Sequence, residues 1–162
     1  GAIDIVIKQA ELMSSNINPG SVVYDSGAEM EHLMVAEDSV LLSRMIAEAL
    51  HKSGYANVEM FPDGRELWNK IQIYRDEDSL DENVAVVITD IEMPQMDGHR
   101  LTKLIKDDEK LKKIPVIIFS SLITEEMRRK GKELGADEQM SKPEIGRLVE
   151  VIDHLLLRVK KG

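Results

Sequence analysis

Acidic, hydroxyl and amino side chains follow directly after short apolar stretches of the sequence. Glu37 and Asp38 follow the first stretch, Asp90 and Ser120 follow two later ones, and Lys142 follows the last. Clustered carboxylates repel one another, and oxygen ligands with vacant positions suit Mg²⁺, which neutralises them. A carboxylate beside such a metal can attack phosphorus, while an ammonium and a hydroxyl neutralise the transferred oxygens. These residues therefore predict Mg²⁺-dependent phosphoryl transfer, with Asp90 as the nucleophile and Lys142 and Ser120 holding the phosphoryl oxygens.

Each of these residues also has an ordinary structural explanation. An Asp or Ser after a strand most often caps the next helix, and an exposed Lys most often has no specific role. The prediction depends on their joint occurrence at strand ends that a single sheet edge would bring together.

Strands buried on both faces of a parallel sheet appear in a sequence as short unbroken apolar runs. Four such runs and a weaker fifth are present, namely Leu33–Ala36, Val58–Phe61, Val84–Thr89, Val116–Phe119 and Glu138–Ser141. Apolar residues at helical spacing separate them. We expect a helix that ends at Gly54, one over Arg65–Tyr74, one beginning near Asp97, one between Thr124 and Gly135, and one over Ile145–Val159. The polar stretch Asp76–Asn83 is expected to be a surface loop.

Strand and helix thus alternate five times, which indicates an α/β fold: a five-stranded parallel sheet with helices on both faces. Right-handed crossovers leave few topologies, and the flavodoxin-like order 2-1-3-4-5 is the commonest for five strands. Such sheets bind ligands at the carboxyl ends of the strands, where the strand order reverses. Asp90, which ends a central strand, is therefore expected in the middle of the crevice.

Composition narrows the class of protein further. The 162 residues are enough for one domain with a sizeable core. The net charge of −9 disfavours nonspecific binding to nucleic acid. No stretch approaches the roughly 20 apolar residues of a membrane span, and the absence of cysteine suits a cytoplasmic protein. We therefore expect a cytoplasmic domain that neither binds nucleic acid nor inserts into a membrane.

The first part of the chain differs from the rest. The predicted sheet begins near Glu31, so we divide the chain into residues 1–30 and a domain over residues 31–162. Ile3–Met13 could form a helix, and Asn16–Gly27, which contains Asn, Pro, Gly and Ser, has the composition of a linker.

Four motifs carry a resemblance to a known family. They are Val35–Ser39 (VAEDS), Ile88–Gly98 (ITDIEMPQMDG), Pro115–Ser121 (PVIIFSS) and Ser141–Pro143 (SKP). In order and spacing they resemble the signatures of response-regulator receiver domains of two-component signalling. The resemblance implies a domain, not a classical enzyme, that accepts a phosphoryl group from a histidine kinase.

The resemblance also implies a role for each matching residue. Asp90 would be the phosphoacceptor, and Lys142 would pair with the phosphoryl group. Asp38 and Glu37 would bind Mg²⁺ directly or through water, together with Asp90. The backbone carbonyl of Glu92 would complete the metal site. Ser120 would be the switch hydroxyl, and the peptide bond between Lys142 and Pro143 would be cis.

Three positions depart from the family pattern. Glu37 stands where a second Asp is commoner, and its extra methylene should still reach the water shell of the metal. Ser120 replaces the commoner Thr and keeps the hydroxyl. Gln139 stands where many receivers carry a Tyr or Phe that turns inward on activation, so the usual aromatic coupling is not expected here.

A finer resemblance is to the receiver of the CheV family of chemotaxis coupling proteins. It rests on Met93–Gly98, on Gln139 and on Asn16–Pro19. It implies a role in chemotaxis, with residues 1–30 as the tail of a preceding adaptor domain and a chemoreceptor or adaptor complex as a partner.

Two other functions fit part of the sequence. A Mg²⁺-dependent aspartyl phosphohydrolase would share the nucleophile, but no cap insertion follows Asp90. A non-phosphorylated interaction module would need none of the acidic groups. The four histidines, His32, His51, His99 and His154, lack the spacing of metal ligands.

Overall fold

Five parallel strands form the sheet of the computed structural model, which describes residues 28–161. They are β3 (His32–Ala36), β4 (Asn57–Phe61), β5 (Val86–Thr89), β6 (Val116–Ser120) and β7 (Glu138–Ser141). Their order is β4-β3-β5-β6-β7, with every neighbouring pair parallel. The predicted order 2-1-3-4-5 is therefore confirmed, and the strand order reverses between β3 and β5.

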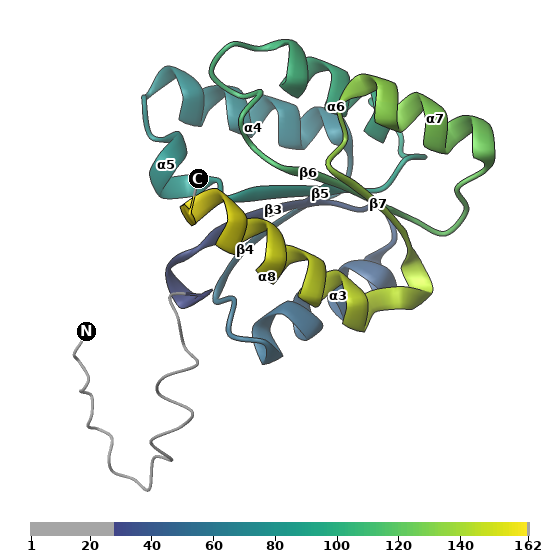
Figure 1. Ribbon diagram of the computed structural model, residues 1–162, viewed down its shortest axis with the longest axis horizontal. Coiled ribbons are helices and arrows are strands. Elements are labelled where there is room, and N and C mark those ends of the chain that lie inside the picture. Colours follow the sequence, from purple (N-terminus) through teal and green to yellow (C-terminus); the bar gives the residue numbers. More distant parts are fainter. Residues whose placement is uncertain (1–27, 162) are drawn as a thin grey trace, which may run out of the picture.

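Helices cover both faces of this sheet (Figure 1). On one side lie α4 (Gly64–Asp76), α6 (Gly98–Asp107) and α7 (Glu125–Leu134). On the other side lie α3 (Val40–Lys52) and α8 (Ile145–Lys161). Three short elements complete the described chain: the 3₁₀ helices η1 (Ala28–Met30) and η2 (Lys142–Glu144), and the helix α5 (Leu80–Asn83).

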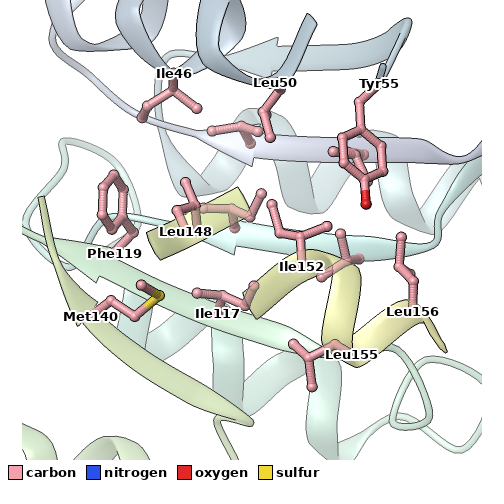
Figure 2. Packing of buried hydrophobic residues seen from close by; sticks show 14 residues of the cluster. Ile46, Leu50, Tyr55, Ile117, Phe119, Met140, Leu148, Ile152, Leu155 and Leu156 are labelled. Carbon is pink, nitrogen blue, oxygen red and sulfur yellow. The ribbon is translucent and has the colours of Figure 1, made fainter. Parts of the chain in front are cut away.

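The alternation of side chains along each strand divides the core into two layers. Leu33 and Val35 of β3 belong to the layer beneath α3 and α8, whereas Met34 and Ala36 belong to the layer beneath α4 and α6. Figure 2 shows the first layer, in which Ile46 and Leu50 of α3 lie near Leu148 and Ile152 of α8. These four side chains form one buried cluster with Ile117, Phe119 and Met140. A buried branched or aromatic side chain contributes about 1.5–3 kcal/mol to stability. This double layer makes the sheet a rigid support for the loops at its edge.

Capping residues begin the helices where the sequence predicted. The Asp97 side chain accepts a hydrogen bond from the Arg100 backbone N–H at 2.7 Å and so caps α6. The Thr124 hydroxyl accepts one from the Met127 N–H at 3.1 Å and caps α7. Gly135 ends α7 with φ of 101°, a left-handed conformation that glycine adopts readily. These caps fix where each helix leaves the edge of the sheet.

The expectation of a loop over Asp76–Asn83 was wrong in part, because its second half forms α5. Leu80 is buried there against the layer under α4, and the Asn83 side chain donates a hydrogen bond to the Ser79 carbonyl at 2.9 Å. A single apolar residue in a polar stretch gives no helical period, so the sequence pattern did not predict this turn.

The predicted helix over Ile3–Met13 and the linker over Asn16–Gly27 lie outside the described residues. None of the helices between residues 28 and 161 is long and apolar enough to cross a membrane.

Candidate functional site

The carboxyl ends of β3, β5, β6 and β7 open onto one pocket at the reversal of strand order. It is lined by Glu37, Asp38, Ser39, Asp90, Glu92, Ser120, Ser121, Leu122, Met127 and Lys142. All six residues that the sequence predicted for the site are among them. The structure therefore brings together groups that are separated along the chain by whole strand–helix units.

Asp90 lies at the centre of this pocket, directly after β5. Its backbone N–H donates to the Ala36 carbonyl of β3 at 3.0 Å, which fixes the start of the loop. One carboxylate oxygen, Oδ1, accepts a hydrogen bond from the Ile91 N–H at 2.7 Å. The other, Oδ2, lies 2.7 Å from Lys142 Nζ. The side chain is thus almost buried and both of its oxygens are oriented.

Lys142 links the two buried carboxylates. Its Nζ lies 2.9 Å from Glu37 Oε1 and 2.7 Å from Asp90 Oδ2, and all three side chains are at most 9% exposed. Burial lowers the pKa of Lys142, but the hydrogen bonds and negative charges of Asp90 and Glu37 outweigh it and raise the pKa overall. Lys142 therefore carries its positive charge beside the carboxylate of Asp90.

Glu37 is held in place from two sides. Its second oxygen, Oε2, accepts a hydrogen bond from the Ser39 N–H at 3.0 Å, where the chain turns into α3. Burial raises the pKa of Glu37, and the nearby charge of Asp90 raises it further. The Ser39 N–H and Lys142 oppose this increase. The carboxylate of Glu37 thus lies in the pocket, and its contact with the water shell of a metal stays a prediction.

Asp38 differs from these two carboxylates because it is exposed at the rim. Carboxylate oxygens of Glu37, Asp38 and Asp90 all lie within 4.8 Å of one another. The three acids and Lys142 together carry a formal charge of −2, which a divalent cation would balance. A compact set of oxygen donors with one accessible member fits Mg²⁺, which keeps several water ligands.

Ser120 and Glu92 complete the predicted set. Ser120 is the buried last residue of β6 and is paired in register with Ser141 of β7, next to Lys142. Glu92 is exposed at the wall of the pocket. The role of the Glu92 backbone carbonyl as a metal ligand stays a prediction.

η2 begins at Lys142 and has Pro143 as its second residue. The cis bond expected before Pro143 stays a prediction.

Gly98 supports the site in a way that the motif alone did not explain. Its N–H donates to the Ile91 carbonyl at 2.7 Å, which closes the loop that follows Asp90. A Cβ atom at this position would overlap the backbone carbonyl oxygen of Asp90. Glycine is required here because α6 begins in direct contact with the backbone of Asp90.

Four further lining residues were not predicted: Ser39, Ser121, Leu122 and Met127. Ser39 and Ser121 stand next to residues that were predicted, so adjacency could have found them. Leu122 and Met127 carry no chemical signal in the sequence. Only the turn of the chain from β6 into α7 brings them to the pocket.

His99 is buried where α6 meets α7. Burial lowers its pKa, and Lys130 lowers it further, while Asp97 and a hydrogen bond with the backbone of Met127 act in the opposite direction. Its Nε2 is buried without a hydrogen-bond partner. The folded protein therefore favours the neutral ring.

This burial predicts a loss of stability in mild acid. The ordinary pKa of 6.5 applies to the unfolded chain, and the folded value is lower. The unfolded state therefore binds more protons as the pH falls below about 6.5, and unfolding becomes easier until the folded pKa is reached. As the pH is lowered, the urea midpoint should fall less steeply in His99→Leu than in the wild type. Exposed His154 changed to Leu is the control, and equal slopes for all three proteins would contradict the prediction.

Known proteins that are similar to this chain contain the kind of domain that its four motifs predicted. Residues 33–153 match the family model described as response regulator receiver domain. A gliding motility regulatory protein from Myxococcus xanthus is 29% identical over 159 residues, which cover 98% of this chain and 19% of that protein. The chemotaxis protein CheV2 from Helicobacter pylori is 33% identical over 124 residues, which cover 76% of this chain and 38% of that protein. The chain thus spans well under half of the length of either relative.

Among solved structures, the signal receiver domain of a signal transduction histidine kinase from Syntrophus aciditrophicus has a TM-score of 0.70 to this fold. The identity is 27%, and the match covers 82% of this chain and 94% of that domain. A nearly complete receiver domain therefore superposes on the described part of this chain.

Proposed function

Because the chain belongs to the response regulator receiver domain family, we propose that it accepts a phosphoryl group from a histidine kinase onto Asp90. Members of this family are signalling domains and not classical enzymes. In this proposal phosphorylation is self-catalysed and requires Mg²⁺, the domain also removes its own phosphoryl group, and the modification switches a partner-binding surface.

One observation carries the proposal: the buried Asp90 carboxylate is held by Lys142 and by the Ile91 N–H while it faces an acidic pocket. An Asp that only capped a helix or paired with a lysine would not need a second buried acid and a third exposed one beside it. The arrangement orients a nucleophile and leaves room for an incoming group.

The chemistry follows from these positions. An oxygen of Asp90 forms a bond to phosphorus, the N–P bond of the donor phosphohistidine breaks, and its electron pair stays on the imidazole nitrogen, which takes a proton from water. Lys142 Nζ neutralises one phosphoryl oxygen, and the Ser120 hydroxyl donates a hydrogen bond to another. When bound, Mg²⁺ would supply further neutralisation of the phosphoryl oxygens. Glu37, Asp38 and Asp90 would hold it, with the carbonyl of Glu92.

We further propose that the pathway is chemotaxis and that the domain works in the cytoplasm. The similarity to CheV2 supports a chemotaxis role. In this proposal residues 1–30 would be the tail of a preceding adaptor domain. A chemoreceptor or adaptor complex is then the expected partner.

Removal of the metal tests the proposal on the wild-type chain. With acetyl phosphate and Mg²⁺ the protein should gain the mass of one phosphate, measured by intact-mass spectrometry. With excess EDTA this gain should disappear, because the three clustered acids then lack the cation that permits a phosphoryl anion to approach. The same gain with and without EDTA would exclude the proposed metal dependence.

The two other functions predict different results in the same assay. A phosphohydrolase would release phosphate steadily from a small phosphate ester and accumulate little modified protein. An interaction module would neither gain phosphate nor bind Mg²⁺.

A further inference from the structure

α7 is attached to the domain without a buried apolar side chain. Of its ten residues only Gly131 is buried, and most of the others are charged and exposed. Surface helices usually pack through an apolar stripe, which supplies most of the stability of their attachment. Because Met127 and Leu134 are only half-buried, polar contacts should also help to hold α7.

The side chain of Gln139 on β7 supplies such a contact. Its Nε2 donates a hydrogen bond to the Arg128 carbonyl of α7 at 2.8 Å. The Arg128 side chain returns a longer bond of 3.4 Å to the Gln139 carbonyl. Two elements that are adjacent in the chain are thus joined by a reciprocal pair of polar contacts.

The amide of Gln139 also fills the notch that Gly131 leaves in α7. A Cβ atom at Gly131 would overlap Gln139 Oε1 and would lie 2.8 Å from its Cδ. The Gln139 amide therefore occupies space that is free only because residue 131 is a glycine.

One atom of the Gln139 amide makes this contact less stable. Gln139 Oε1 is buried and has no hydrogen-bond partner. A buried carbonyl oxygen that loses water without gaining a donor opposes the contact, and this offsets part of what the Nε2 bond contributes. Gln139 of β7 thus contacts α7 in the structure, but breaking this contact needs little free energy.

The contact lies beside the proposed phosphorylation site. Met127, which lines the pocket, immediately precedes Arg128 in the first turn of α7. Gln139 stands on the strand that delivers Lys142 to Asp90. The first turn of α7 therefore lines the pocket through Met127 and contacts the Gln139 amide through the carbonyl of Arg128.

We propose that Gln139 is a positioning residue that locks α7 through the Arg128 carbonyl and the notch at Gly131, and that phosphorylation of Asp90 releases this lock. The second half rests on the proposed function; the first half does not. The lock is made by an amide and requires no aromatic ring.

Hydrogen exchange of the α7 amides in the full chain tests the lock without any phosphoryl group. Gly131→Ala should slow exchange if only helix propensity matters, because Ala favours a helix over Gly. The lock opposes this gain, because the added methyl also expels the Gln139 amide, so the slowing should be smaller than the same change causes when no amide is present. Gln139→Ala, which removes the bond without changing α7, should make α7 exchange faster by about two- to tenfold, the range that one net hydrogen bond implies.

The double variant makes the test specific. When Gln139 is already Ala, the methyl of Gly131→Ala meets no amide, so it should slow α7 exchange relative to Gln139→Ala alone. Gly146→Ala in α8 is the matched control, because a Cβ there would meet no heavy atom within 4 Å apart from the neighbouring backbone of its own helix; it should leave α7 unchanged. Equal slowing of α7 exchange by Gly131→Ala with Gln139 intact and with Gln139 already Ala would overturn the lock.

Addition of Mg²⁺ and acetyl phosphate tests the release. Wild-type α7 exchange should rise several-fold, and Gln139→Ala, already open, should show no further rise. A wild-type protein that gains phosphate mass without faster α7 exchange would overturn the release. A protein that gains no phosphate would refute the proposed function, and the Gly131 experiment would still decide the lock.

Discussion

Asp90→Asn protein should gain no phosphate from acetyl phosphate and Mg²⁺, whereas the wild type gains one. The amide has almost the same shape as the carboxylate, and its oxygen can still accept the Ile91 hydrogen bond. It lacks the anionic oxygen that forms the bond to phosphorus. The fold should persist, because Lys142 keeps its ion pair with Glu37.

Asp97→Asn is the matched control for this experiment. It makes the same chemical change in the same loop, at an exposed residue whose role is to cap α6. Asn caps helices as well as Asp does, so this variant should remain phosphorylated. Uptake of phosphate by Asp90→Asn at the wild-type rate would refute Asp90 as the acceptor.

Lys142→Met should be the more damaging change for stability. It removes the positive charge between Glu37 and Asp90 and leaves two buried carboxylates without a cation. Breaking a buried ion pair from one side costs about 3–5 kcal/mol in free energy of unfolding. Mg²⁺ should restore more stability to this variant than to the wild type, because it would become the only cation near the two acids. Phosphorylation should slow by about 10²-fold, since one neutralising group for the phosphoryl oxygens is lost.

Urea denaturation with and without Mg²⁺ measures these effects. Lys103→Met is the control, because Lys103 pairs with Asp107 on the exposed face of α6, where both side chains are more than half exposed. Such a surface pair contributes about 0.3–0.5 kcal/mol. If Lys142→Met unfolded as easily as this control at every Mg²⁺ concentration, the electrostatic role assigned to Lys142 would be wrong.

The parts of the fold that the sequence predicted are those with a repeated signal. β3, β5 and β6 contain unbroken apolar runs, and the sheet order followed from the number of strand–helix units. The site was predicted for the same reason: Asp90, Lys142 and their neighbours stand at strand ends, and a parallel sheet brings those ends to one edge.

Features that depend on one contact between distant elements were not predicted. α5 forms because Leu80 is buried in the core, and the polar sequence around Leu80 does not predict this burial. The role of Gly131 can be recognised only when the Gln139 amide is seen to lie against it. His99 is buried because α7 covers it.

The scarcity of buried side chains on α7 has a consequence for how such domains can diversify. A helix whose only buried position is Gly131 imposes almost no constraint from the core on its seven exposed residues. Substitutions on its outer surface could therefore accumulate without repacking the protein, while the acidic pocket stays unchanged. A duplicated copy could acquire a new binding preference through α7 alone, and two copies with the same chemistry could serve separate circuits in one cell without cross-talk.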